Sequence, residues 1–593
     1  MFLRAHDRTK DGKAHCYWSL VETGRTPDGP RQRTLCYLGE LNGFAQARWL
    51  KTIEVFNQQG ESRQLQLFPA DRAPSEDDPR IARIRVDRVR MERTRHFGEC
   101  FLAWELWRRL QLDRFWEGVL DQSGEEPEVP WSRVAALLAI NRLCAPGSEL
   151  AIEQRWFPTT ALDDILGLAK DKINDTRLYR CLDRLLPHKT KLEQHLRQRY
   201  GELFAAEFDV LLYDLTSSYV EGAAAKNPMM QRGYSRDHRP DCKQLVIALI
   251  VNGEGFPLSY ETFNGNRADA RSLEAVMRMV ERKYGKARRV WVFDRGIVSE
   301  ENLRRLRRHQ GQYLVGTPRS QLRRFEQELL RQDWTRARDG IEVKLVPAPG
   351  GEETYLLCRS AARQEKEKAM RSRFSRDMER ALAGLEKQLR GGKLKDRNKA
   401  ERRLGAIRAR YSRVADLYHT EILETEKQLK LDWKIREDRR AWQQAREGAY
   451  LLRSNLPPSD PDQLWKSYIQ LTEAEAAFRA LKSELAVRPI YHQLEPRTKA
   501  HLLVAFLGYA LWVALKHLLP AKKLDYSPTE ALSLASSLHS ADIVLPTTDG
   551  REIRLRRITT PTEKQRVLFE RLGIVIPDRL NLDQECSADS AIA

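Results

Sequence analysis

Two apolar segments that each lead into an aspartate constrain the fold of this chain most strongly. The first segment, FDVLLYD at residues 208 to 214, ends at Asp214, and the second, RVWVFDRG at 289 to 296, contains Asp294. Apolar runs of this length, bounded by polar residues, are typical of buried strands. Because a lone buried carboxylate is costly unless it is paired or binds a cation, we expect both aspartates to meet a partner.

The residues around these two segments predict an α/β domain. Two more strand-like segments, QLVIALIV at 244 to 251 and PLSYETF at 257 to 263, precede a predicted helix from Ala270 to about Tyr284. A helix over residues 299 to 309 and a short strand, QYLVGT, follow the second aspartate. The predicted order is therefore three strands, a helix, a fourth strand, a second helix and a short strand.

Charge and length limit the possible partners and the domain count. The 593 residues include 102 Lys and Arg against 83 Asp and Glu, a formal charge of +19. A basic chain favours a polyanionic partner, nucleic acid before membrane. The length exceeds the roughly 250 to 300 residues at which a single core stops growing, so we expect several domains.

Cysteine usage and hydropathy indicate a cytoplasmic protein. The eight cysteines include no CxxC pair, which argues against a disulfide framework or a structural zinc site and suits a reducing compartment. The N-terminus, MFLRAHDRTK, lacks the apolar region of a secretory signal. The most apolar stretch, from Leu502 to Leu515, is shorter than the ~20 residues of a membrane span, and we interpret it as a core helix.

A third carboxylate is expected in YIQLTEAEAAFRALKSEL, at residues 468 to 485, which contains Glu473, Glu475 and Glu484. If this segment is one helix, its core-facing stripe consists of Ala474, Ala477, Phe478, Leu481 and Leu485. Glu475 borders the stripe, whereas the other two glutamates fall on the opposite flank. Glu475 is therefore the preferred candidate.

Three further side chains lie near Glu475 on such a helix. Tyr468 and Lys482 are each seven residues away and thus nearly in line with it, and Arg479 lies one turn further on. A solvent-exposed pair between Glu475 and Arg479 is the plainer alternative for this segment.

The chain resembles the insertion-sequence DDE transposases, in particular the group with a tyrosine, glutamate and lysine signature on the last catalytic helix. The resemblance rests on DLTSSYVEG, GYSRDHRPDCKQLVIALIVNGEGFPLSYETFNGN, WVFDRGIVSEENL and YxxLxxxExxxxxxK. It covers residues 80 to 320 and 445 to 520. One position departs from the pattern, because Leu471 stands where the group commonly has an arginine.

The resemblance implies an RNase H-like mixed sheet whose first and fourth strands are neighbours, so that Asp214 and Asp294 meet. With Glu475 they would form the metal-binding and catalytic triad. Oxygen-only ligands favour Mg²⁺, for which Mn²⁺ can substitute, over zinc. Two such ions ~3.5 to 4 Å apart would activate a water or a 3'-hydroxyl and stabilise the leaving oxygen.

The expected DNA contacts lie on the last helix, after the fourth strand, and in the loop GYSRDHRPDCKQ. They are Tyr468, Lys482, Arg479, Arg236, His238, Arg239, Lys243 and Arg295. The loop residues could instead belong to a solvated turn. His238 lacks a second histidine at ligand spacing, which argues against a metal role. Ser217 and Ser218 are expected to hydrogen-bond locally.

Composition and the resemblance together predict seven segments. They are a β-rich N-terminal segment (1–56), a linker (57–80), a mainly helical domain for binding DNA ends (81–205), the RNase H-like core (206–334), a partly helical insertion (335–445), the rest of the core (446–525) and a small C-terminal unit with the tail (526–593). Arginines 83, 85, 88, 90, 93 and 95 are expected to give a strand one cationic face, for solvent or for phosphate.

The predicted function is a transposase that binds the ends of its mobile element and catalyses metal-dependent DNA cleavage and strand transfer. Double-stranded DNA and a second copy of the chain are the expected partners, in the cytoplasm at the nucleoid. A DNA-binding protein with an inactive transposase-like core is the alternative. A carboxylate hydrolase such as a glycosidase would need only two acids and no basic surface, so the charge of +19 counts against it.

Overall fold

The computed structural model describes the backbone of five strands between residues 2 and 66 and, with side chains, most of residues 84 to 580. The gaps in this second range are 123–127, 268–271, 286–288, 295–297, 332, 349–352, 426–427, 458–459, 549 and 578–579. The chain forms two compact units. We call residues 200–479 the sheet unit, and residues 1–199 with 480–593 the helical unit.

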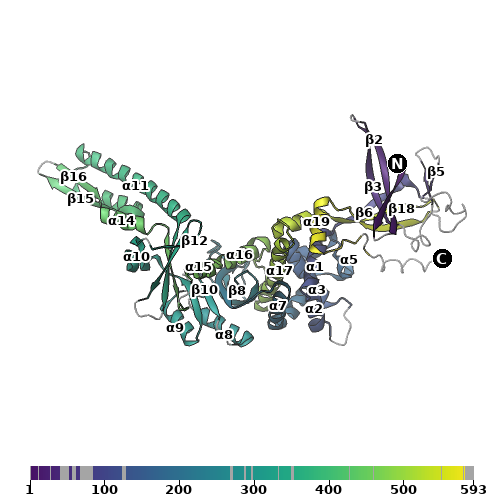
Figure 1. Cartoon of the computed structure of the whole chain (residues 1–593), viewed down its shortest axis with the longest axis horizontal. Coiled ribbons are helices and arrows are strands. Elements are labelled where there is room, and N and C mark those ends of the chain that lie inside the picture. The colour runs from purple at the N-terminus through teal and green to yellow at the C-terminus, as the bar shows by residue number, and fades with distance from the viewer. Residues whose placement is uncertain are drawn as a thin grey trace. The chain divides into compact units, whose positions relative to one another are not determined.

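The sheet unit is built on one nine-stranded mixed sheet with the order β12-β13-β14-β17-β11-β10-β7-β8-β9 (Figure 1). The strands are β7 (Val210–Tyr219), β8 (Gln244–Asn252), β9 (Pro257–Asn264), β10 (Val290–Phe293), β11 (Gln312–Gly316), β12 (Thr335–Arg338), β13 (Ile341–Pro347), β14 (Thr354–Ser360) and β17 (Ala449–Ser454). β7 is antiparallel to β8 and parallel to β10, which is parallel to β11. The order β9-β8-β7-β10-β11 is the predicted RNase H-like arrangement, which is confirmed.

Burial explains why these sequences form the middle of a sheet. Every residue of β8 is buried, as expected for a continuous apolar strand covered on both faces. Helix α16 (Leu471–Arg479) packs on β7 and β8, and α9 (Glu300–Arg308) packs on β11. Helix α8 (Leu273–Tyr284) matches the predicted helix except at its start, where 268–271 lie outside the described residues.

The region predicted as a partly helical insertion, residues 335–445, begins with strands. β12, β13 and β14 extend the core sheet, and only then do the long helices α11 (Ala361–Arg390) and α12 (Arg397–Arg410) follow. These helices and the hairpin of β15 (Tyr418–Thr425) and β16 (Gln428–Ile435) share their own apolar core, and we call residues 361–435 the arm. In Figure 1 α11 extends away from the sheet with β15 and β16 beside it.

The helical unit is centred on α17 (Glu495–Ala521), which packs against α1 (Gly98–Arg109), α3 (Trp131–Cys144) and α6 (Asp175–Leu185). Residues 480–525, predicted as part of the core, therefore group with the helical unit instead. α17 is also longer than its apolar centre suggested, and it is long and apolar enough to cross a membrane. Because 78% of its most apolar window is buried inside the protein, it is a core helix.

Small sheets complete the helical unit. β6 (Arg90–His96) pairs with β18 (His539–Pro546), which pairs with β19 (Glu552–Ile558), so the predicted C-terminal unit shares a sheet with the arginine-rich segment. The cationic face predicted there is wrong for Arg95, a buried residue whose guanidinium pairs with Asp163 and Asp164 at 2.6 Å each.

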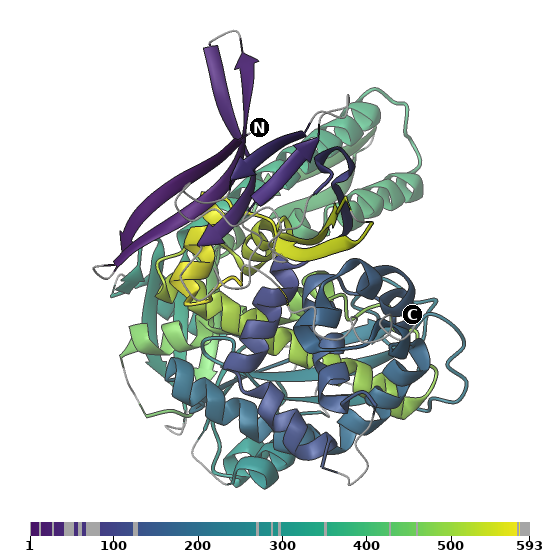
Figure 2. The ribbon, with the colours of Figure 1, turned by 90° about the vertical axis from the view of Figure 1, so that its right-hand side faces the viewer.

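The N-terminal segment contains strands, as the predicted β-rich composition indicated. β2 (Lys13–Thr26) is antiparallel to both β1 (Phe2–Lys10) and β3 (Gly29–Glu40), and these strands are drawn in purple in Figure 2. β4 (Thr52–Phe56) pairs with β5 (Ser62–Gln66), which falls inside the predicted linker.

Candidate active site

Strand register brings the two aspartates to the same level of the sheet. β7 and β10 run parallel with Val292 opposite Leu212, so two residues further along both strands Asp294 is level with Asp214. Asp214 is partly buried and accepts a hydrogen bond at 2.7 Å from the backbone N–H of Leu215. Asp294 directly follows the end of β10 and is exposed. Asp214 thus lies in the middle of β7, level with Asp294 just after the end of the shorter β10, and not at the strand end where its apolar run stops.

On the next strand, β11, Gly316 lies close to the side chains of Tyr468 and Asp294. Phe293 lies opposite Val315, which places Gly316 at the end of β11 beside Asp294. A Cβ atom on Gly316 would lie 2.6 Å from the hydroxyl oxygen of Tyr468 and 3.5 Å from Oδ1 of Asp294. Any side chain at this position would have to displace the end of the Tyr468 side chain, so Gly316 belongs to the site. One hint of it is visible in the sequence, because the strand QYLVG ends in glycine directly after the apolar run.

Glu475 reaches the site from α16, although the predicted single helix over residues 468 to 485 is wrong. Tyr468 lies in α15 (Pro461–Ile469), and the π-helical turn η10 (Ala480–Glu484) follows α16. The predicted stripe is nevertheless buried, and its members on α16 face the sheet. Glu475 is exposed at the edge of that stripe. Among the described residues, it forms no ion pair with Arg479.

The pKa of Asp214 is affected by burial and by the charges of Asp294 and Glu475. Burial raises this pKa from 3.8 to about 6. The Leu215 N–H and the nearby Arg236 lower the pKa, whereas the negative charges of Glu475 and Asp294 raise it further. Acids from three separate elements therefore repel one another at one place, and a cation would relieve this repulsion.

The donor set suits a hard divalent cation. Mg²⁺ and Mn²⁺ prefer carboxylate oxygens and keep several water ligands, so partly exposed acids leave room for them. Within the part of the chain that the structure describes, the oxygens of Asp214, Asp294 and Glu475 do not all gather within 4.8 Å of one another. The residues present fit the predicted metal.

The loop between β7 and β8 contacts the site through Arg236. Its backbone N–H donates to Oγ of Ser217 at 3.2 Å, as expected for a locally bonded serine, and its charge acts on Asp214. Arg239 is engaged differently: its guanidinium donates to Glu221 at 3.0 Å and to Asp241 at 2.9 Å and stacks on the Tyr219 ring. In this part of the loop, Arg239 is therefore paired with neighbouring acids of the protein, as in a solvated turn.

The remaining predicted DNA contacts are distributed more widely. His238 is exposed with a positive φ of 56°, and Lys243 is partly buried at the end of the same loop. Arg479 is exposed at the end of α16, and Lys482 lies on η10 in the helical unit. Arg295 lies outside the described residues.

Comparison with known proteins places this fold and site in a family. The family profile described as "Transposase DDE domain" matches residues 206–511, and the profile "IS1634 family transposase, N-terminal domain" matches residues 3–62. A comparison with curated proteins gave no match. Among solved structures, the piggyBac transposase synaptic complex with hairpin DNA is 9% identical and covers 74% of this chain and 79% of its own, with a TM-score of 0.33. That similarity is too distant to carry an argument.

The first profile alone spans more than half of the chain and contains both aspartates, Gly316 and Glu475. The N-terminal profile belongs to an insertion-sequence family. The chain is therefore a member of the insertion-sequence DDE transposases.

Proposed function

We propose that this transposase binds the ends of its mobile element as double-stranded DNA and cuts and joins them with Asp214, Asp294 and Glu475 as its catalytic carboxylates. The observation that carries the proposal is the parallel register of β7 and β10, which sets Asp294 level with Asp214, where the charge of Glu475 also acts. Three carboxylates from β7, from the end of β10 and from α16 would be brought together at a cost in repulsion only if a ligand offsets it.

Asp214, Asp294 and Glu475 would hold Mg²⁺ or Mn²⁺. When bound, such ions activate a water or a 3'-hydroxyl and stabilise the leaving oxygen of an in-line displacement on phosphorus. The chain supplies the rigid frame: β7 and β10 fix the two aspartates, and the Leu215 N–H holds one oxygen of Asp214.

Tyr468 is proposed to position the DNA strand at the site. A Cβ atom on Gly316 would lie close to both the Tyr468 hydroxyl oxygen and Oδ1 of Asp294, so the tyrosine hydroxyl lies near this aspartate. A phenol there can donate to a phosphate oxygen, whereas a covalent intermediate is not needed for a metal-assisted displacement. Arg236, which already acts on Asp214, is the proposed phosphate contact from the loop.

Lys482, Arg479, Lys243, Arg295 and His238 remain proposed DNA contacts, and Arg239 a weaker one because it is already paired. We also propose that two copies of the chain bring two element ends together.

The test is cleavage of a DNA fragment carrying one element end, with Mg²⁺ or Mn²⁺, by Asp214→Asn, Asp294→Asn and Glu475→Gln proteins. Each variant should lose cutting by at least about 100-fold, the scale of removing one group that stabilises transition-state charge. End binding, measured by gel shift, should stay close to that of the wild type.

Glu473→Gln is the matched control, because it changes a glutamate on the same helix two residues away. It should cut normally. Near-normal cutting by Glu475→Gln would contradict the assignment, and end binding without cutting by the wild-type protein would favour a DNA-binding protein with an inactive core.

A further inference from the structure

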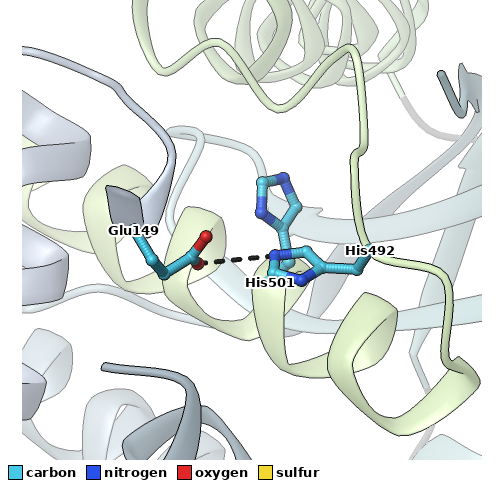
Figure 3. Close-up of side chains that lie close together, drawn as sticks. All are labelled: Glu149, His492 and His501. Carbon is cyan, nitrogen blue, oxygen red and sulfur yellow. Dashed lines mark ion pairs between the residues drawn. The ribbon is translucent and has the colours of Figure 1, made fainter. Parts of the chain in front are cut away.

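We infer that Glu149, His492 and His501 form a second metal site, for a divalent ion of the Zn²⁺ type, inside the helical unit. One ligand atom from each residue lies within 4.8 Å of the others, and all three side chains are buried (Figure 3). This site is separate from the acids of the sheet unit. The sequence held no signal for it, because Glu149 is more than 340 positions from the two histidines.

The spacing of one pair already suits a shared ion. Oε1 of Glu149 and Nε2 of His492 are 3.4 Å apart. Ligand bonds of about 2.0 Å in a tetrahedron place neighbouring ligand atoms about 3.3 Å apart. Two nitrogens and one carboxylate oxygen form a donor set that zinc accepts, with water in the fourth position.

The third ligand is already oriented by the backbone. Nε2 of His501 lies 3.3 Å from the carbonyl oxygen of Val487, and because a carbonyl can only accept, Nε2 carries the proton. The other ring nitrogen, Nδ1, then offers its lone pair. A histidine that ligates a metal typically donates its second ring N–H to a carbonyl or carboxylate in this way.

The surroundings hold the rings in place. The Tyr179 ring meets His492 edge-on at 5.9 Å, and the two histidine rings are 5.2 Å apart. Arg142, fully buried, donates to the carbonyl of Ala486 at 3.3 Å and adds one positive charge nearby. That charge favours the competing, metal-free arrangement in which Glu149 pairs with His492 and Arg142. The experiment therefore has to separate the two arrangements.

A metal bound to these three residues would link two segments that are far apart in the sequence. Glu149 begins the short helix α4 (Glu149–Ala151), His492 precedes α17 and His501 lies on it. A metal here would fix the returning chain to the first part of the helical unit.

The test uses the untagged full-length protein carrying Asp214→Asn, Asp294→Asn and Glu475→Gln, so that the proposed catalytic acids do not contribute. After removal of metal with EDTA, the protein is titrated with Zn²⁺, and bound metal is measured by mass spectrometry. We expect about one Zn²⁺ per chain and a rise in Tm of several degrees, because a ligand that binds only the folded state stabilises it. Co²⁺ should give the visible absorption of a tetrahedral site.

Glu149→Gln, His492→Ala and His501→Ala should each weaken binding by more than the ~10 to 100-fold typical of losing an outer hydrogen-bond partner. His419→Ala, which changes an exposed histidine of β15, is the matched control and should bind normally. If Zn²⁺ does not bind, or if the Glu149→Gln substitution lowers Tm equally with Zn²⁺ and with EDTA, the cluster is a metal-free ion pair and the inference is wrong. These readouts do not depend on DNA cleavage, so they stand apart from the proposed function.

Discussion

At the scale of single residues, Asp214 should destabilise the metal-free protein. Its pKa is raised from 3.8 to about 6, so its contribution to stability is complete below pH 3.8 and is lost as the pH rises through 6. At 1.36 kcal/mol per pKa unit the loss is about 3 kcal/mol, an upper value. Asp214→Asn should therefore raise the Tm measured in EDTA at pH 8, with the gain vanishing near pH 4.

The control for that measurement is Asp241→Asn. The pKa of Asp241 is lowered, mainly by its hydrogen bonds from Arg239, so its replacement should bring no gain in Tm at pH 8. An Asp214→Asn protein with an unchanged or lower Tm at that pH would show that the ionised Asp214 carboxylate does not destabilise the folded protein.

Gly316 should couple to Tyr468. In Gly316→Ala the new Cβ would occupy space 2.6 Å from the tyrosine hydroxyl, so the phenol has to move. We expect slower cutting of element ends with little change in Tm, because only the end of one side chain is displaced. If the effect acts through that hydroxyl, Gly316→Ala combined with Tyr468→Phe should cut no more slowly than Tyr468→Phe alone. Additive losses in the cleavage assay would contradict this coupling.

At the scale of elements, the arm should be removable from the catalytic sheet. β14 and β17 are antiparallel neighbours with Arg359 opposite Ala449, and the Ser360 N–H donates to the Gly448 carbonyl at 3.1 Å. A short turn can therefore join the two strands in place of residues 361 to 447, which comprise the arm and the following helix α14 (Glu437–Ala445), and the arm has its own apolar core. We expect a folded protein with a cooperative thermal transition. An aggregated or molten product would show that the sheet depends on the arm.

The loop between β7 and β8 should contribute unequally to DNA binding. Affinity for element ends should fall with salt, with a log-log slope of roughly −0.9 for each phosphate contact. Arg236→Gln should reduce the slope by about one contact, whereas Arg239→Gln should change it less, because Glu221 and Asp241 already pair with Arg239. Equal slopes for the wild type and the Arg236→Gln protein would remove Arg236 from the interface.

The same elements show what the sequence could and could not predict. Apolar runs predicted the five central strands, since buried strands leave a direct pattern in the sequence, but β7 continues to Tyr219 beyond Asp214, where the apolar run ends. Periodicity identified the buried face of α16 but not the break at Gln470 or the π-helical turn after Arg479, because such breaks depend on tertiary packing. The strands β12 to β14 were missed because the composition of residues 335 to 445 as a whole is dominated by the long charged helices that follow these strands. Gly316 and the Glu149 cluster depend on contacts between distant segments.

At the scale of the whole molecule, the account depends on one claim: acids from three distant parts of the chain hold a divalent metal. The most direct measurement is a crystal structure of the full-length protein soaked with Mn²⁺, using the anomalous signal to locate the ion. We predict an anomalous peak about 2.1 Å from carboxylate oxygens of Asp214 and Asp294, with Glu475 turned toward it. A well-diffracting crystal in which saturating Mn²⁺ leaves these carboxylates without a shared peak would contradict the account.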